Sequence, residues 1–201
     1  NEVLGEAFES GTVASLADAF AGERDDRRLM DMVLTLYRFM QSHPFPEKWL
    51  AEKVAMYFPG PEEQASLSPW QRVIVAYAQE TASHCVGLLS RALEECREDP
   101  AVEKAFYAPL EKDRASFREM EALAAQGDWD GLSQWVGGFK PAPAKAPNGY
   151  KDDPLTVRVK AYRDGAKSAA EELQKYLSAG REACARETAQ TAPLVRGLGG
   201  L

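Results

Sequence analysis

The sequence has 201 residues, 45% of them hydrophobic and 27% charged, with 31 acidic side chains against 24 basic ones and a formal net charge of −7. This length allows one sizeable domain or two small ones, and the apolar fraction is ordinary for a protein that buries a core. No apolar run reaches the roughly 18 to 20 residues that a membrane span requires, so we expect a soluble, cytoplasmic protein without a membrane helix. The first residues, NEVLGEAFESG, lack an initiator Met and any signal-peptide pattern, so we expect a segment excised from a longer protein.

The first predicted helix covers residues 26–42, where apolar residues recur at helical spacing. Its apolar stripe is Leu29, Met30, Val33, Leu36, Tyr37 and Met40. The chain then continues as SHPFPEKWL, in which Pro44 disfavours helical geometry at His43 and Pro46 suits the first turn of a new helix. We therefore interpret this stretch as a helix-to-helix corner and not as a catalytic site.

Two long helices are predicted next, from Ser68 to about Cys96 and from Pro100 to Gly127, with Pro109 as an expected kink. The expected buried stripe of the first is Trp70, Ile74, Tyr77, Thr81, Cys85, Leu88 and Ala92. That of the second is Val102, Phe106, Leu110, Phe117, Met120 and Ala124. His84 lies next to the first stripe and is interpreted as a packing residue, because no second metal ligand lies four residues further on.

The last strong pattern follows Pro154, where apolar residues alternate in steps of four and three and so predict a coiled-coil-like seam against a partner helix. These residues are Leu155, Val159, Tyr162, Ala166, Ala169, Leu173 and Tyr176. Before it, residues 137–154 are rich in proline, glycine and lysine, which is typical of an extended, exposed loop. A flexible connection at the tip of a hairpin and a functional loop both remain possible. Since no strand of useful length shows alternation, we predict an all-α bundle of long antiparallel helices in a single domain, residues 1–201.

The sequence contains no motif for catalysis. The phosphate-binding pattern GxxxxGK[ST] is absent, as are GxGxxG, HExxH and GxSxG. The three cysteines, Cys85, Cys96 and Cys184, lack CxxC spacing, so neither a disulfide framework nor a zinc site is indicated. Acidic runs such as residues 94–98 are interpreted as solvated helix faces.

Charge is distributed unevenly along the chain. Residues 1–138 hold 13 Lys/Arg and 24 Asp/Glu, whereas residues 139–201 hold 11 and 7. The basic excess occupies the loop and the first half of the helix after it: Lys140, Lys145, Lys151, Arg158, Lys160, Arg163 and Lys167. The last three recur at steps of three and four, so they share a helix face that could follow a phosphate backbone, although many helices carry such a face for solubility alone.

Four stretches, LADAFAGERDDRRL, LYRFMQSHPFPEKWL, GDWDGLSQWVGGFK and DDPLTVRVKAYRDGAKSAAEEL, together resemble the AddA family. AddA is the helicase-nuclease subunit of the bacterial AddAB recombination-repair complex, and in it these stretches occur in this order in a helical insertion of the first motor domain, subdomain 1B. The resemblance spans nearly the whole chain and is most specific over residues 16–50 and 127–177. It implies an all-α accessory segment of a UvrD-like superfamily 1 helicase that works in DNA repair and recombination.

The resemblance also implies what this chain lacks. The parent subunit binds ATP and Mg²⁺ and carries a nuclease domain, but none of those motifs matches a position here. We therefore expect no catalytic, cofactor-binding or metal-binding residue, and no enzymatic activity from this chain alone. The expected partners are the remaining motor domains and an AddB-type subunit.

In related motors the corresponding arm contacts duplex DNA ahead of the separation point. Such contacts would be made to phosphates, and so be independent of sequence and dependent on salt, with the seven basic residues as candidates. Because the whole chain is acidic, we expect weak binding. The alternative is a helical scaffold that docks on the motor or partner subunit without touching DNA. Its contact surface would be Trp129, Trp135 and Phe139, although burial in a core beneath a turn, which we favour, explains them as well.

Overall fold

The computed structural model describes residues 27–58 and 66–199, and the chain divides after Ser68 and after Arg181 into two compact units. The described residues form seven α-helices and one short 3₁₀ helix, with no strand among them, which confirms the all-α prediction. The single domain expected for residues 1–201 stays a prediction. None of the described helices combines the length and the apolar character needed to cross a membrane.

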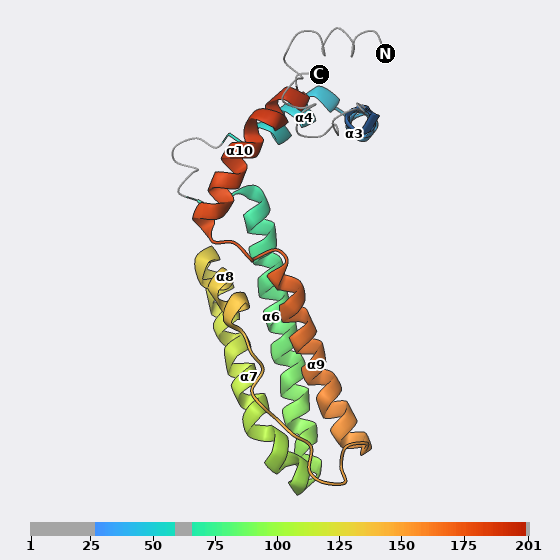
Figure 1. Cartoon of the computed structure of the whole chain (residues 1–201), viewed down its shortest axis with the longest axis vertical. Helices are drawn as coiled ribbons and strands as arrows, with labels where there is room; N and C mark the ends of the chain where they lie inside the picture. Colours follow the sequence, from blue (N-terminus) through green and yellow to red (C-terminus); the bar gives the residue numbers. More distant parts are fainter. Residues whose placement is uncertain (1–26, 59–65, 200–201) are drawn as a thin grey trace. The chain divides into compact units, whose positions relative to one another are not determined.

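The unit from Pro69 to Arg181 is built on a hairpin of two long helices, α6 (Pro69–Glu95) and α7 (Pro100–Gln126), joined by the 3₁₀ helix η1 (Cys96–Glu98) (Figure 1). The Asp99 carboxylate caps α7 by accepting hydrogen bonds from the backbone N–H groups of Ala101 and Val102, at 2.7 and 3.2 Å. Gly127 ends α7 with a φ of 68°, a left-handed conformation that glycine adopts without a steric penalty. Both helices therefore begin and end within a residue or two of their predicted bounds.

The buried face of α6 differs from the predicted stripe. It consists of Gln71, Val75, Ala78, Ala82, Cys85, Leu89, Ala92 and Leu93. Only Cys85 and Ala92 were predicted, while Tyr77 is 45% exposed and His84, expected to pack, is exposed. The reason is that α6 packs against α7 on one side and against α9 (Pro154–Gln174) on another, so the face between its two neighbours is the buried one. Ala78 and Ala82 on this face are both fully buried.

The predicted seam on α9 holds only in part. Leu155, Val159, Ala166 and Leu173 are buried, but Tyr176 lies beyond the helix end and is 50% exposed. Ala170 and Leu177 are buried in addition. A straight helix drifts about 20° per heptad from a strict seven-residue repeat, which moves the buried stripe to neighbouring positions along its length. The coiled-coil pairing is thus not confirmed.

The segment expected to be a turn around Trp129 is instead the helix α8 (Trp129–Gly138), whose first turn is capped by Asp128. Trp129 and Trp135 are buried, and their indole N–H groups donate to the carbonyls of Ala179 and Ser116 at 2.9 and 3.0 Å. Each indole thus buries its ring while its polar atom keeps a partner. The preferred interpretation of these tryptophans as core is confirmed.

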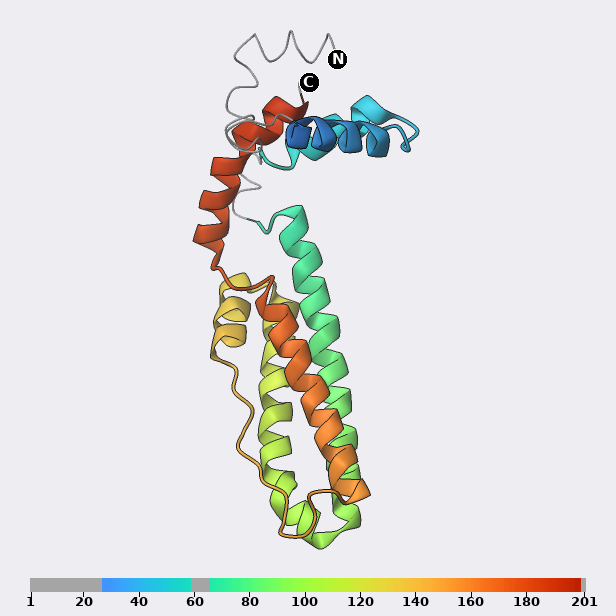
Figure 2. The same ribbon diagram turned by 45° about the vertical axis from the view of Figure 1, so that its right-hand side comes forward.

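Residues 139–153, which we call the strap, run from α8 back alongside α7 toward the η1 end of the hairpin, as Figures 1 and 2 both show. The tip of the α6–α7 hairpin is formed by η1, whereas the strap joins α8 to α9. The strap is attached at two points along α7. The Ala142 N–H donates to Asp113 at 2.7 Å, and the Tyr150 hydroxyl donates to Asp99 at 3.3 Å.

The other unit contains α3 (Arg27–Met40), α4 (Pro46–Ala55) and most of α10 (Arg181–Gly199). The corner between α3 and α4 is where the prolines predicted it. The imidazole of His43 stacks on the Trp49 ring, with centroids 4.5 Å apart, and Phe39 meets both rings edge-on. The corner interpretation is confirmed. Residues 16–26, part of the resemblance, lie outside the described residues.

Candidate nucleic-acid interface

Arg163, one of the seven predicted DNA contacts, lies where α7, α9 and the strap meet. Its Nε donates to the Asp113 carboxylate at 2.7 Å, and its Nη2 donates to the carbonyl of Ala142. The side chains of Arg163 and Asp113 are only 14% and 4% exposed. Together with the hydrogen bond from Ala142 to Asp113, these contacts form a closed arrangement that we call the clasp. Arg163 therefore holds the strap in place and does not face solvent with Lys160 and Lys167.

Arg158 is also paired within the unit. Its Nε donates to Glu95 at 3.0 Å, and its Nη2 lies 3.6 Å from Glu98. The Tyr162 hydroxyl donates to the same Glu95 at 2.8 Å, and this hydrogen bond, followed by that from Arg158, lowers the pKa of the Glu95 carboxyl. The same pairing raises the pKa of Arg158. Residues 94–98 are thus more than a solvated face, since Glu95 links α6 to α9.

Lys167 forms a third pair, but an exposed one. Its ammonium lies 3.5 Å from Glu171 one turn further along α9, and the two side chains are 52% and 62% exposed. A pair of this kind contributes at most about 1 kcal/mol and exchanges readily with solvent or another anion. Lys167 therefore remains accessible, but with its charge partly compensated.

Four of the predicted contacts have no acidic partner among residues 27–58 and 66–199. They are Lys140, Lys145, Lys151 and Lys160. The first three are exposed on the strap, and Lys160 is half-buried on α9. These four side chains are the ones best placed to meet an external anion.

The structure brings one further cation to this group. Lys112 of α7 and Lys140 of the strap both line a shallow surface depression of about 290 Å³, together with Trp135 and Phe139. Lys112 lies in the acidic part of the sequence, so no local excess of basic residues marked it. Only the return of the strap along α7 places it beside Lys140.

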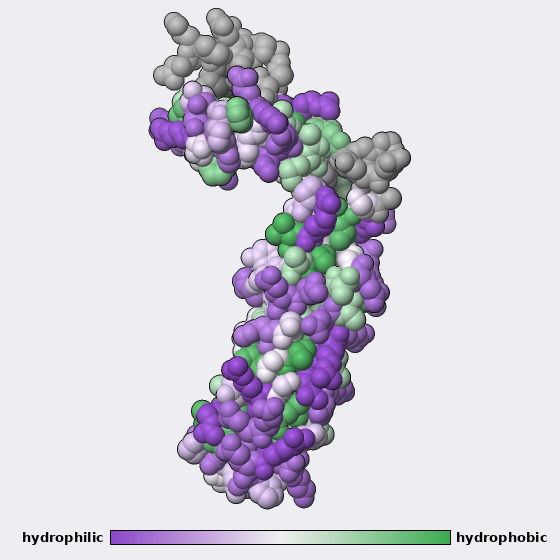
Figure 3. Space-filling model, turned by 180° about the vertical axis from the view of Figure 1, so that it is seen from behind, coloured by the Kyte–Doolittle hydropathy of each residue, from purple (hydrophilic) through white to green (hydrophobic). Residues whose placement is uncertain are grey.

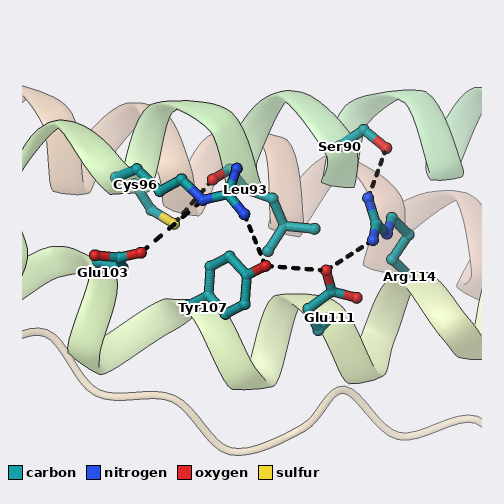
Figure 4. Close-up of polar contacts among 8 residues, drawn as sticks. Ser90, Leu93, Cys96, Glu103, Tyr107, Glu111 and Arg114 are labelled. Carbon is teal, nitrogen blue, oxygen red and sulfur yellow. Dashed lines mark hydrogen bonds and ion pairs between the residues drawn. The ribbon is translucent and has the colours of Figure 1, made fainter.

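Two arginines of the hairpin, Arg97 and Arg114, make contacts inside it (Figure 4). Arg114 donates to Glu111 at 2.7 Å and to Ser90 at 3.4 Å. Arg97 donates to the Tyr107 hydroxyl at 2.8 Å and covers that ring. These residues stabilise the hairpin and add little to a cationic surface. In Figure 3 the unit shows a largely hydrophilic face with scattered hydrophobic side chains.

The described residues contain no grouping of side chains suited to a metal ion, and the Cys85 thiol is buried. Among residues 27–58 and 66–199, no three His, Cys, Asp or Glu side chains are grouped so that they could hold a metal ion. Cys85, Cys96 and Cys184 form no disulfide with one another, and burial raises the pKa of Cys85 to about 11. A thiol with so high a pKa stays protonated and unreactive at neutral pH.

Comparison with known proteins gives the family. No family profile matches the chain. An ATP-dependent helicase/nuclease subunit of the AddA type from Geobacillus thermodenitrificans is 32% identical over 165 residues, which cover 80% of this chain and 13% of that protein. Its counterpart of the same name from Geobacillus kaustophilus is 31% identical over 162 residues, again 80% of this chain and 13% of the relative. The counterpart from Desulforamulus reducens is 26% identical over 205 residues, or 98% of this chain and 16% of the relative.

The chain belongs to the AddA family. The match to AddA extends along nearly the whole chain but spans only 13 to 16% of the length of these relatives. The chain therefore represents one part of an AddA helicase/nuclease subunit, which agrees with the resemblance seen in the sequence.

Proposed function

We propose that this chain is a non-catalytic helical accessory segment of an AddA-type helicase/nuclease, the 1B insertion of its first motor domain, and that it contacts duplex DNA through phosphates. The parent subunit would supply the ATP site, the Mg²⁺ site and the nuclease centre outside this chain. Its partners would be the remaining motor domains and an AddB-type subunit.

The observation that carries the proposal is the set of strap lysines. Lys140, Lys145 and Lys151 are exposed, have no acidic partner among the described residues, and lie on a segment attached to a rigid helix. Lysine is a point charge that binds phosphate without reading the bases, so such a surface suits sequence-independent contact with a DNA backbone. Since Arg158 and Arg163 are engaged inside the unit, the DNA-binding role rests on the strap and Lys160 rather than on one face of α9.

Fluorescence anisotropy of a labelled 20-base-pair duplex tests this proposal. We expect weak binding at 50 mM salt, similar for two unrelated sequences, that falls at least tenfold at 200 mM. Changing Lys140, Lys145, Lys151 and Lys160 to Ala should remove it. The matched control changes Lys48, Lys53, Lys104 and Lys175 to Ala, which alters the net charge equally but leaves the strap intact. Absence of binding by the unchanged chain at 50 mM salt would refute DNA contact for this segment.

A second candidate function is docking without DNA contact, and the unit containing α3 and α4 favours it. No residue of α4 is buried, while Phe45, Phe39 and Tyr37 are 72%, 57% and 55% exposed. Aromatic side chains gathered on a surface are typical of protein interfaces. This surface differs from the one suggested by the sequence, since Trp129 and Trp135 are buried. Replacing Phe39 and Phe45 with Ser should weaken association with the rest of the subunit if docking is the role.

A further inference from the structure

The strap is held along α7 at two separated points, and this geometry determines how far apart its lysines lie. Its first attachment is Ala142 on Asp113, and its second attachment is Tyr150 on Asp99. Asp99 and Asp113 are separated by roughly 14 residues of α7, which at 1.5 Å per residue is about 21 Å. Lys140 lies two extended residues, about 6 Å, before the first point, and Lys151 directly follows the second one. With an extended strap alongside a regular helix, these lengths add to about 27 Å between the backbone positions of Lys140 and Lys151.

Both attachments are hydrogen bonds from the strap to an aspartate carboxylate. The first one is the clasp, in which the buried Asp113 carboxylate binds the strap backbone and Arg163 together. At the second one, the Tyr150 hydroxyl donates to Asp99, whose charge raises the pKa of that hydroxyl. Lys145 lies between the two points, and all three lysines are exposed. The strap thus presents three exposed lysines one after another along α7 (Figure 2).

We propose that the strap is a ruler for duplex DNA, a row of three phosphate contacts that spans about eight base pairs, since successive base pairs rise about 3.4 Å along the axis. This inference rests on the proposed function and adds a geometry for the ligand. A double helix would lie lengthwise along the strap and contact all three lysines, instead of contacting the strap at one lysine only. A free ammonium on a long stem adapts to phosphates at slightly different positions, which suits contact with any sequence. The support matters because a flexible loop of the same composition would have to be ordered on binding, at a cost in affinity.

The number of contacts sets the expected salt dependence. Three neutralised phosphates give a slope of about −2.7 in log K against log salt, so affinity falls about 40-fold between 50 and 200 mM salt. If the three contacts act together, the affinity should also depend on duplex length. It should rise steeply until a stem can meet all three lysines and then change little.

Anisotropy with DNA hairpins whose stems have 4, 6, 8, 10, 12 and 16 base pairs measures both quantities for the 201-residue chain. We expect affinity to rise up to a stem of about 8 to 10 base pairs and then to level off. The variant Lys140→Gln, Lys145→Gln, Lys151→Gln should bind the longer stems at least tenfold more weakly and lose most of the salt slope. The control Lys48→Gln, Lys53→Gln, Lys175→Gln changes the net charge equally and should keep the plateau.

The outcomes separate this inference from the function on which it rests. If the unchanged chain binds no stem at low salt, DNA contact itself fails. If the chain binds but its affinity already levels off at 4 base pairs, or rises without a plateau to 16, the ruler is refuted and DNA contact stands. Equal losses in the two triple variants would also refute it, because they would show that only the overall charge matters. Circular dichroism of both variants checks that the exposed substitutions leave the helices intact.

Discussion

The clasp offers the sharpest test of how this unit holds its strap. Arg163→Met removes the guanidinium but keeps an apolar stem of similar length. It leaves the Asp113 carboxylate, with its side chain 4% exposed, with the Ala142 N–H as its remaining donor. Removal of one partner from a buried ion pair costs about 3 to 5 kcal/mol, because the other charge stays buried without compensation. Since whole domains are stable by only about 5 to 15 kcal/mol, this loss should be large.

Urea unfolding followed by circular dichroism measures the effect, with Asp113→Asn and the double variant completing a thermodynamic cycle. The two side chains are 2.7 Å apart, so the double variant should cost less than the two single variants added together, by at least about 1.5 kcal/mol. Lys167→Met is the matched control on the same helix. It removes one charge from an exposed pair and should cost less than about 1 kcal/mol. If Arg163→Met lowers the free energy of unfolding by less than about 1 kcal/mol, or if the effects of the two single variants add strictly, Arg163 and Asp113 do not form a stabilising buried ion pair.

Three further predictions concern the core, the α6–α9 link and the end of α7. Burial raises the pKa of Cys85 from 9.0 to about 11, so this thiol should react with a disulfide reagent at pH 8 only after the chain unfolds. Rapid labelling of Cys85 in the folded chain would show that the thiol is not buried. The pKa of Glu95 is lowered from 4.5, first by the Tyr162 hydroxyl, so its contribution to stability is present above pH 4.5 and is lost as the pH falls below it. Tyr162→Phe should therefore reduce the drop in urea midpoint between pH 7 and pH 3, and an unchanged drop would count against the link. Gly127→Ala should destabilise the chain by about 1 to 2 kcal/mol, because Gly127 has a φ of 68°. Gly87→Ala should be neutral or stabilising, because Gly87 lies within α6 and a Cβ there would meet open space. Similar effects of the two substitutions on the free energy of unfolding would contradict this prediction.

Local chemistry in the sequence predicted most of the helices. The cap at Asp99, the stop at Gly127 and the prolines around His43 act over a few residues, so their effects could be read without knowledge of the fold. The same local signals explain why the sequence did not predict the helix α8. Its segment holds three glycines, which have low helix propensity, and the tertiary burial of Trp129 and Trp135 outweighs that local preference.

The site was predictable as a basic segment but not as a surface. The sequence marks seven basic residues between 140 and 167, yet it does not show which of them have acidic partners. Arg163 and Asp113 are 50 positions apart, and Arg158 and Glu95 are 63 apart. These pairs form only because α9 packs against the hairpin. Exposure of the charge is therefore a property of the folded unit.

By itself the sequence determined the helical class, the corner at His43, the bounds of α7 and membership of the AddA family, because periodicity, caps and motifs are carried by neighbouring residues. Only the tertiary structure decided which face of α6 is buried, that the proline-rich segment is a strap, and which of the basic residues remain available to an anion. Those outcomes depend on contacts between residues far apart in the chain, and burial between two neighbouring helices selects among faces that the sequence pattern alone leaves nearly equivalent.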